Sequence, residues 1–206
     1  MDLAAYLTHI LALENDPSKG LFTDAQNTVA LRVALYRYSV LRPYLVSRLF
    51  DGNGTKIITP TDLTALNILK AWHVQDEVQN NIELQFYAYL NAGIWTFETK
   101  DYAVPTGTDN VQVDVGISHT IEDLDTATET TIPAEDEFAV ANYAAGYACR
   151  QIAISNIQTN NLNPDESERY ENMGTLLINN FNSLISKEHD IVRTAIWHDD
   201  SIDRAY

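Results

Sequence analysis

The chain contains 206 residues, of which 45% are hydrophobic and 20% charged, and its 13 Lys and Arg against 29 Asp and Glu give a formal net charge of −16. This length and apolar fraction are typical of one folded domain, or of one domain with a sizeable insertion, and they exclude a disordered chain. Binding to a phosphate backbone needs clustered Lys and Arg, so the charge argues against nucleic-acid binding as the main activity.

The sequence predicts a protein without a membrane span or an internal cross-link. No run of about 18 apolar residues occurs. The segment after Met1 lacks the basic region of a secretory signal, so we expect the chain to begin its life in the cytosol. The single cysteine, Cys149, excludes an internal disulfide and a thiolate zinc cluster. It lies in an alanine-rich helical stripe and is predicted to be a small buried side chain.

Residues 1–43 are predicted to form the N-terminal helices of a bundle. The first helix covers residues 2–13. The second begins at Thr23, which forms a capping box with Gln26, and it ends near Pro43, which cannot continue the helical hydrogen bonds. Spacings of four, three and four predict a buried face on this second helix, made by Val29, Val33, Tyr36 and Val40.

Residues 44–131 are predicted to form an inserted β-rich module of five or six short strands. Tyr44–Phe50, the turn residues Asp51–Gly54 and a return strand over Thr55–Ile58 predict a tight hairpin. A clear alternation begins at Ile82 and places apolar residues on one face through Leu90. Two further strands are expected over residues 94–99 and 111–117, and the latter alternates valine with polar residues.

Residues 132–187 are predicted to form the C-terminal helices of the bundle. The first begins at Pro133 and runs to about Ile157, and its small residues at helical spacing let another helix approach closely. The second begins near Pro164 and is expected to bury Tyr170, Met173, Leu177, Phe181 and Leu184. Residues 188–206 are expected to be a flexible tail. The fold class is therefore α+β, a helical bundle with an antiparallel β module inserted between the second and third long helices.

The sequence contains no strong catalytic or cofactor motif. Nucleotide-binding glycine loops, the GxSxG elbow and the HExxH zinc motif are all missing. His119 follows a strand just before an acidic segment, and a structural histidine is the expectation there. A small metal-dependent hydrolase that uses His119 and nearby carboxylates remains an alternative. We expect a protein that is not an enzyme and that carries no cofactor and no metal.

The charges are distributed unevenly along the chain. Residues 98–137 contain eleven acidic residues and one basic residue, Lys100, whereas residues 32–56 contain five of the 13 basic residues. Two interpretations are open. The acidic segment is either a solvated loop, or it contacts the basic segment of a neighbouring copy, and such a heterologous contact closes rings.

Two stretches resemble a known protein family. Leu35–Pro43, followed by the turn at Asp51–Gly54, resembles the front half of the head–tail adaptor (connector or neck) proteins of tailed bacteriophages. Val111–His119, then Thr131–Pro133 opening an alanine-rich helix over 141–153, resembles their back half, and Pro164–Phe181 fits their closing helix. The acidic linker 122–137 and the segment after Lys187 depart from the family pattern.

The resemblance implies a structural virion protein at the head–tail junction, assembled in the host cytoplasm and without catalytic residues. Such proteins form a ring, usually of twelve copies, that docks under the portal protein, extends the DNA channel and presents a platform to a neck or tail protein. Genomic DNA passes through the lumen without specific binding, and no membrane is involved. Another virion ring component, such as a tail terminator or neck protein, is the alternative within this class.

The charge distribution and the tail suggest which residues make the contacts of such a ring. We expect a basic group to meet an acidic group on the neighbouring copy, and an apolar group in the tail to order against the portal or neck. The basic residues are Arg37, Arg42 and Arg48, the acidic residues are Glu122, Asp123 and Asp125, and the tail residues are Ile191, Ile196 and Trp197.

Overall fold

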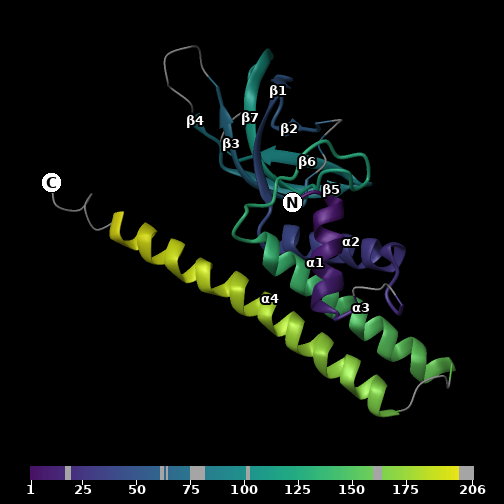
Figure 1. The fold of residues 1–206 in the computed structure, drawn as a ribbon. Helices are drawn as coiled ribbons and strands as arrows, with labels where there is room; N and C mark the ends of the chain where they lie inside the picture. The colour runs from purple at the N-terminus through teal and green to yellow at the C-terminus, as the bar shows by residue number, and fades with distance from the viewer. Residues whose placement is uncertain are drawn as a thin grey trace. The chain divides into compact units, whose positions relative to one another are not determined.

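The computed structural model describes residues 1–16, 20–60, 63, 65–74, 82–100, 103–159 and 164–199, with side chains described except at 156–159, 164 and 187–199. Within these residues the chain forms four helices and seven strands, and every strand pair is antiparallel (Figure 1). This confirms the α+β class. Two compact units divide the chain: unit 1 contains residues 1–38 and 119–206, and unit 2 contains residues 39–118.

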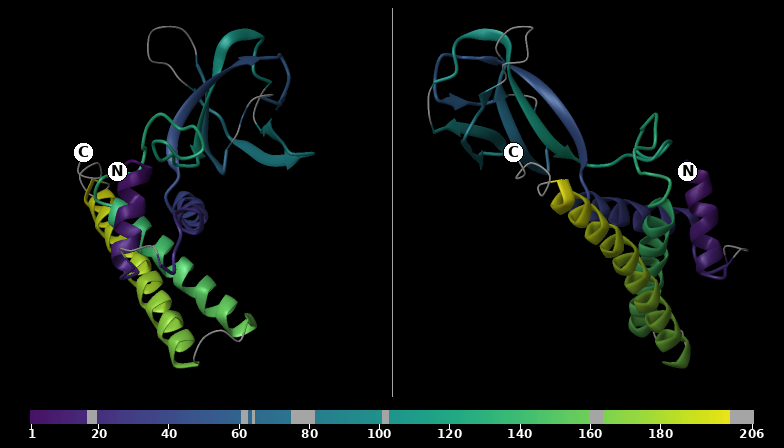
Figure 2. Two further views of the ribbon diagram at one scale, coloured as in Figure 1. Left: turned by 45° about the vertical axis from the view of Figure 1, so that its right-hand side comes forward. Right: turned by 90° about the vertical axis from the view of Figure 1, so that its left-hand side faces the viewer.

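Unit 1 is a helical bundle. Its helices are α1 (Leu3–Leu13), most of α2 (Asp24–Leu41), α3 (Glu137–Thr159) and α4 (Pro164–Asp199). Helices α3 and α4 run side by side in all three views (Figures 1 and 2). They approach closely because two glycines meet at the crossing: a Cβ added at Gly146 would lie 2.9 Å from the carbonyl oxygen of Gly174.

Local sequence signals fix the starts of the first two helices. The Asp2 carboxylate accepts a hydrogen bond from the Ala5 amide at 2.8 Å and caps α1. The Thr23 amide donates to Gln26 Oε1 at 2.9 Å, and the Gln26 amide donates to Thr23 Oγ1 at 3.3 Å. The predicted capping box is therefore confirmed.

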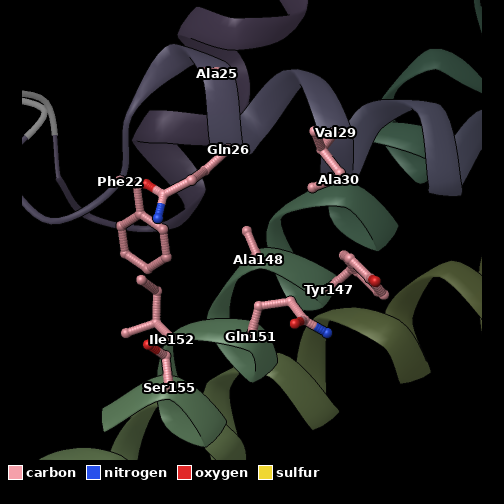
Figure 3. A pocket seen from close by; sticks show the side chains of 10 residues that line it. All are labelled: Phe22, Ala25, Gln26, Val29, Ala30, Tyr147, Ala148, Gln151, Ile152 and Ser155. Carbon is pink, nitrogen blue, oxygen red and sulfur yellow. The ribbon is translucent and has the colours of Figure 1, made fainter. Parts of the chain in front are cut away.

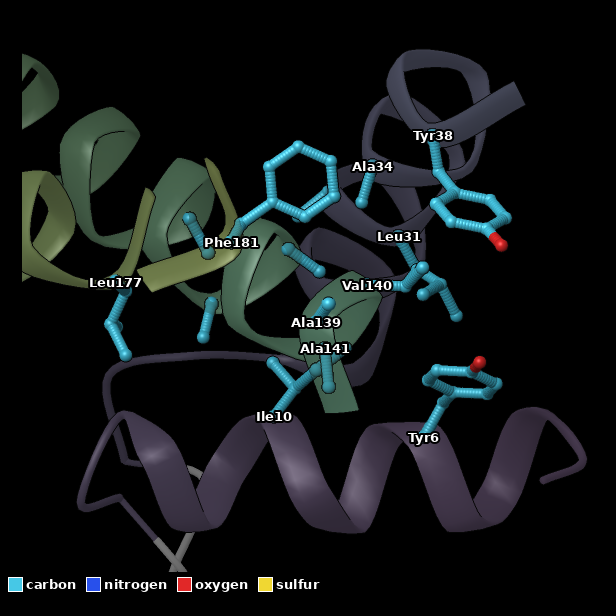
Figure 4. Close-up of a cluster of buried hydrophobic side chains, with 14 of the residues drawn as sticks. Tyr6, Ile10, Leu31, Ala34, Tyr38, Ala139, Val140, Ala141, Leu177 and Phe181 are labelled. Atoms are coloured by element: carbon cyan, nitrogen blue, oxygen red, sulfur yellow. The ribbon is translucent and has the colours of Figure 1, made fainter. Parts of the chain in front are cut away.

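The core of unit 1 gathers side chains from all four helices. Tyr6 and Ile10 project from α1 toward Val140 and Ala141 of α3 (Figure 4). Cys149 is completely buried among alanines, as predicted, and burial raises the pKa of its thiol to about 12. Small residues dominate the face of α3 that meets its neighbours, which allows the backbones to pack closely.

Two predicted core faces are wrong in part. On α2, Val29, Tyr36 and Val40 are 53%, 63% and 47% exposed, because the helix packs through Asn27, Ala30, Leu31, Ala34 and Tyr38 instead. The buried face combines two alanines with Leu31 and Tyr38, and the face that carries Val29, Tyr36 and Val40 points outward. On α4, Leu184 is 39% exposed and Ile185 takes its place in the core.

Unit 2 contains two antiparallel sheets. The first has the order β1 (Tyr44–Gly52), β7 (Gly107–Ile117), β3 (Asn67–His73), β4 (Ile82–Glu83), and the second has the order β2 (Ile57–Ile58), β6 (Ile94–Thr99), β5 (Phe86–Asn91). The predicted alternation of β7 is confirmed, since Val111, Val113 and Val115 are buried between polar neighbours. These valines form the core of unit 2 together with Phe97 and Ile58 of the second sheet.

The predicted hairpin between residues 44 and 58 is wrong. The glycine turn is present, with Gly54 at φ 75°. However, β1 pairs with β7, with Tyr44 opposite Ile117, and β2 pairs with β6, with Ile58 opposite Phe97. The long β7 offers β1 a ladder of seven consecutive partners, from Tyr44 to Phe50, which a two-residue return strand cannot match.

The segment boundaries also differ from those expected. Residues 119–131 belong to unit 1 rather than to the inserted module, because Ile121 and Leu124 are buried in the helical core. Helix α3 begins at Glu137, four residues after Pro133. Helix α4 continues past 187 to Asp199, since no proline or glycine interrupts the helix between these residues. Residues 200–206 of the expected tail lie outside the described residues.

Candidate functional site

The part of the acidic segment that follows β7, residues 119–136, is an acidic loop that the core anchors at three points. Ile121, Leu124 and Ile132 are buried with the helices. Between them Asp123 and Asp125 adopt positive φ angles of 66° and 53°, a conformation that Asp tolerates better than most residues. The Asp123 amide donates to the carbonyl of Ala127 at 2.9 Å. These constraints hold the loop so that its carboxylates point into solvent.

The first residues of the chain are bound to this loop. The Leu3 amide donates to the carbonyl of Glu122 at 3.0 Å, and Thr130 Oγ1 donates to the carbonyl of Met1 at 2.8 Å. The amino terminus pairs with Glu137 at the start of α3. Hydrogen bonds therefore hold the start of the N-terminal helix against the acidic loop.

His119 lies in a buried polar cluster at the base of the loop. Its Nδ1 is 3.0 Å from the carbonyl oxygen and 3.1 Å from Oγ1 of Thr131, and its ring lies 4.9 Å from that of Tyr38. The Tyr38 hydroxyl donates to Asp136 at 2.5 Å, and both residues are almost completely buried. His119 is 6% exposed. Within unit 1, this arrangement connects both ends of the loop to α2: His119 at its start by a ring contact, and Asp136 at its end by a hydrogen bond.

The cluster does not have the composition of a metal centre. Across the described part of the chain, no group of three or more His, Cys, Asp or Glu residues could hold a metal ion. His119 Nδ1 contacts Thr131, and the imidazole ring lies against that of Tyr38.

Arg32 and Asp125 form an ion pair that sequence reasoning did not predict. The guanidinium donates from Nε and Nη2 to both carboxylate oxygens, at distances of 2.6 to 3.0 Å. This contact holds the pKa of the Asp125 carboxyl below its ordinary value. The pair links α2 to the acidic loop across 93 positions of sequence. One of the three acidic interface candidates therefore already has a partner in its own chain.

The other candidates from the sequence lie at several places. Glu122 and Asp123 are exposed on the loop of unit 1, and Arg37 is exposed on α2. Arg48 is exposed on β1 of unit 2, whereas Arg42 is half-buried and has an interaction partner. Ile191, Ile196 and Trp197 belong to α4, and their side chains lie outside the described residues.

Sequence reasoning missed the outward apolar residues as candidates for assembly. The residues whose large apolar side chains stay exposed include Val29 and Tyr36 on α2, Leu45 and Leu49 on β1, and Leu90 on β5. The regular spacing of these apolar residues could have identified them. Such spacing predicts that a face is buried, but it does not show whether the same chain or another chain buries it. Contiguous exposed apolar patches mark interaction surfaces, whereas a single exposed apolar residue needs no explanation.

Comparison with known proteins gives little further information. No family model matches the chain, and no curated protein matches it. A solved structure described as "Neck of empty GTA particle computed with C6 symmetry" is similar over 71% of this chain and 77% of that chain, with 16% sequence identity and a TM-score of 0.30. No helix among the described residues is long and apolar enough to cross a membrane. A TM-score of 0.30 carries no argument, so the function has to be argued from the residues of this chain.

Proposed function

We propose that this chain is a structural virion protein, a head–tail adaptor that assembles into a ring under the portal. The observation that carries the proposal is the order of its parts: a helical bundle interrupted between α2 and α3 by an antiparallel β unit. The phage adaptor proteins that residues 35–43 and 111–133 resemble have helical-bundle folds, some with this insertion. The ring extends the DNA channel and presents a platform to a neck or tail protein.

The charge of the chain suits a conduit for DNA. A channel wall that lets DNA slide must not retain phosphates, and each Lys or Arg contact adds affinity through counterion release. A net charge of −16 on every subunit makes such contacts scarce. We expect the free protein to show no duplex binding even at about 50 mM salt, where screening is weak. Micromolar, salt-sensitive binding in a fluorescence titration would contradict the conduit role.

The exposed charges suggest one part of the contact between neighbouring subunits. Arg37 and Arg48 face solvent, as do Glu122 and Asp123 on the acidic loop. Asp125 contributes less because Arg32 already binds it. We propose that these basic residues, with Arg42, meet the loop of the next copy, and that the copies close into a ring of about twelve, the number usual in the resembling family.

Charge reversal tests this contact. Arg37→Glu, Arg42→Glu and Arg48→Glu are each mixed with the portal protein of the same virus, and the bound protein is measured by co-sedimentation. We expect less bound protein in at least one variant, with partial recovery when Glu122→Lys or Asp123→Lys is present on the partner copies. Arg169→Glu, an exposed position on α4, is the matched control. Unchanged binding in all three variants refutes the contact.

The end of α4 is proposed to contact the portal or neck protein. Ile191, Ile196 and Trp197 supply apolar side chains for such a contact. Among the described side chains, Ile185 is the last residue of α4 in the core of unit 1, so truncation after Lys187 should change thermal stability little. The truncated chain should bind the portal more weakly in the same assay. Equal binding by the full and truncated chains would refute this role.

A further inference from the structure

An uncharged groove lies between α2 and α3 in unit 1. Its volume is ≈ 470 Å³, within the usual range for pockets that enclose a ligand. Phe22, Gln26 and Val29 contribute from the α2 side, and Tyr147, Gln151 and Ile152 contribute from α3 (Figure 3). None of its lining residues carries a charge. Val29, on its rim, is 53% exposed.

An uncharged hairpin projects its side chains from the second sheet of unit 2. Strands β5 and β6 pair from Phe86 opposite Thr99 to Asn91 opposite Ile94, and residues 84–97 contain no charged side chain. Near its turn Tyr89, Leu90 and Ile94 are 41%, 58% and 47% exposed. Leu90 faces Trp95 on one side of the hairpin, and Tyr89 lies on the other side. The hairpin is therefore apolar on both faces.

The hairpin is also at the edge of its sheet. The strand order β2-β6-β5 leaves one side of β5 without a neighbouring strand among the described residues. Soluble proteins usually protect such an edge with lysine, proline or a bulge, and Phe86–Asn91 contains no lysine or proline and pairs with β6 in continuous register. A narrow hairpin that is apolar on both faces fits a groove better than a flat surface.

We propose that the tip of this hairpin on one copy docks into the α2–α3 groove of the next copy. This inference rests on the proposed function, since it names a contact through which the ring closes. Copies that carry a net charge of −16 each repel one another, so contact is favoured where both surfaces lack charge. The groove and the hairpin meet that condition, and both are apolar.

The two surfaces differ, so the contact is heterologous. Every copy offers one hairpin and one groove, and repetition of the same contact builds a closed ring or an open filament. Apolar docking of this kind would supply affinity, whereas the charged residues of the acidic loop would set register and partner choice.

A cross-linking experiment between two single variants tests the pairing. A chain with Leu90→Cys is mixed with a chain with Gln151→Cys under mild oxidation at up to about 1 mM protein, where a contact with a Kd of about 1 mM is half-saturated. The native Cys149 is completely buried and does not compete. We expect a disulfide-linked dimer in the mixture and little in either variant alone. Leu90→Cys mixed with Asn179→Cys, an exposed position on α4, is the control.

Charge insertion supplies an independent measurement. Leu90→Asp and Val29→Asp should each weaken concentration-dependent self-association by about tenfold or more, as seen by sedimentation equilibrium. Leu176→Asp, at a residue that is 61% exposed on α4, should not. The three positions are already exposed, so all three variants should fold.

Several results would overturn the inference. One is a protein that stays monomeric at every concentration tested. Another is a disulfide-linked dimer of Leu90→Cys with Gln151→Cys that forms in no higher yield than the dimer with the α4 control. The third is preferential linking of Leu90→Cys to itself, which would indicate pairing between two β5 edges. Portal binding separates this failure from failure of the proposed function. If Leu90→Asp still forms rings on the portal, the docking contact is wrong and the adaptor role stands. If the unmodified chain forms no ring on the portal, the adaptor role fails whatever the cross-link shows.

Discussion

The helical and the β units of this chain use their apolar residues in different ways. Unit 1 buries a continuous core, and its helices α3 and α4 pack closely where Gly146 and Gly174 face each other. Unit 2 has a smaller core around three valines of β7 and leaves leucine and tyrosine side chains exposed on β1 and β5. Unit 1 therefore satisfies most of its apolar side chains within its own helices, whereas unit 2 leaves a larger share of its large apolar side chains exposed.

The largest expected effect concerns a buried carboxyl in unit 1. Glu14 is 3% exposed, one of its oxygens accepts from Asn27 at 2.9 Å, and the other has no hydrogen-bond partner. Burial raises its pKa from about 4.5 to about 8, and the charge of Asp16 adds to the rise, although the hydrogen bond from Asn27 lowers it. The folded chain therefore keeps the Glu14 proton over a pH range in which the unfolded chain releases it.

Stability must then fall as pH rises through that range. The stability that the protonated Glu14 contributes is fully present below about pH 4.5 and is lost as the pH rises to about 8, with a total of up to about 5 kcal/mol. Glu14→Gln keeps an acceptor for Asn27 and cannot ionise, so it should remove this component. Urea unfolding of both proteins at several pH values gives the difference. A constant difference between the two proteins from pH 5 to pH 9 would contradict the assignment.

The α3–α4 crossing should tolerate no added side chain. A Cβ at Gly146 would lie 2.9 Å from the Gly174 carbonyl oxygen and 2.9 Å from Ile178 Cγ1. Gly146→Val should therefore destabilise the chain by about 3 kcal/mol, the upper part of the range for overpacking. Ala12→Val, at an exposed position in α1, should cost about 0.5 kcal/mol or less. Equal losses in thermal unfolding would show that the glycine pair is not a close contact.

The buried polar cluster should contribute a smaller amount. Tyr38→Phe removes the hydroxyl that donates to Asp136 at 2.5 Å and leaves the ring beside His119 in place. The loss should be about 2 kcal/mol, because a buried carboxyl oxygen loses a donor. Tyr36→Phe on the exposed face of the same helix is the matched control and should be neutral. A neutral Tyr38→Phe would mean that the cluster does not hold the loop.

The smallest effect is expected in unit 2. Leu49 is 52% exposed on β1, so Leu49→Asp should change the free energy of unfolding by about 0.5 kcal/mol or less. Val113→Asp, at a completely buried position on β7, is the contrasting variant and should unfold the unit. Strong destabilisation by Leu49→Asp would show that unit 2 needs this residue for its own stability.

Local signals in the sequence predicted the elements well but their partners poorly. The Thr23 capping box and the alternating valines of β7 depend on residues within a few positions, and both are present. The glycine turn after Phe50 predicted a neighbouring return strand, yet β1 pairs with β7 about 60 positions away. Turn chemistry favours a reversal of the chain but does not determine which strand offers the longest ladder.

The candidate site was less predictable for a similar reason. Charge counting located the acidic and basic segments, but the pairing of Arg32 with Asp125 depends on how 93 positions of sequence fold back. The exposed stripe that includes Val29 and Tyr36 has the period of a core face. Periodicity shows that a face is suited to burial, and an assembling protein can provide the cover from another copy.

Imaging of the assembly tests the central claim most directly. The purified chain is mixed with the portal protein of the same virus, and negative-stain electron microscopy compares the mixture with each protein alone. The account predicts a second ring of density stacked under the portal ring and coaxial with its channel. Portal particles that stay unchanged at saturating concentrations of this chain would contradict it.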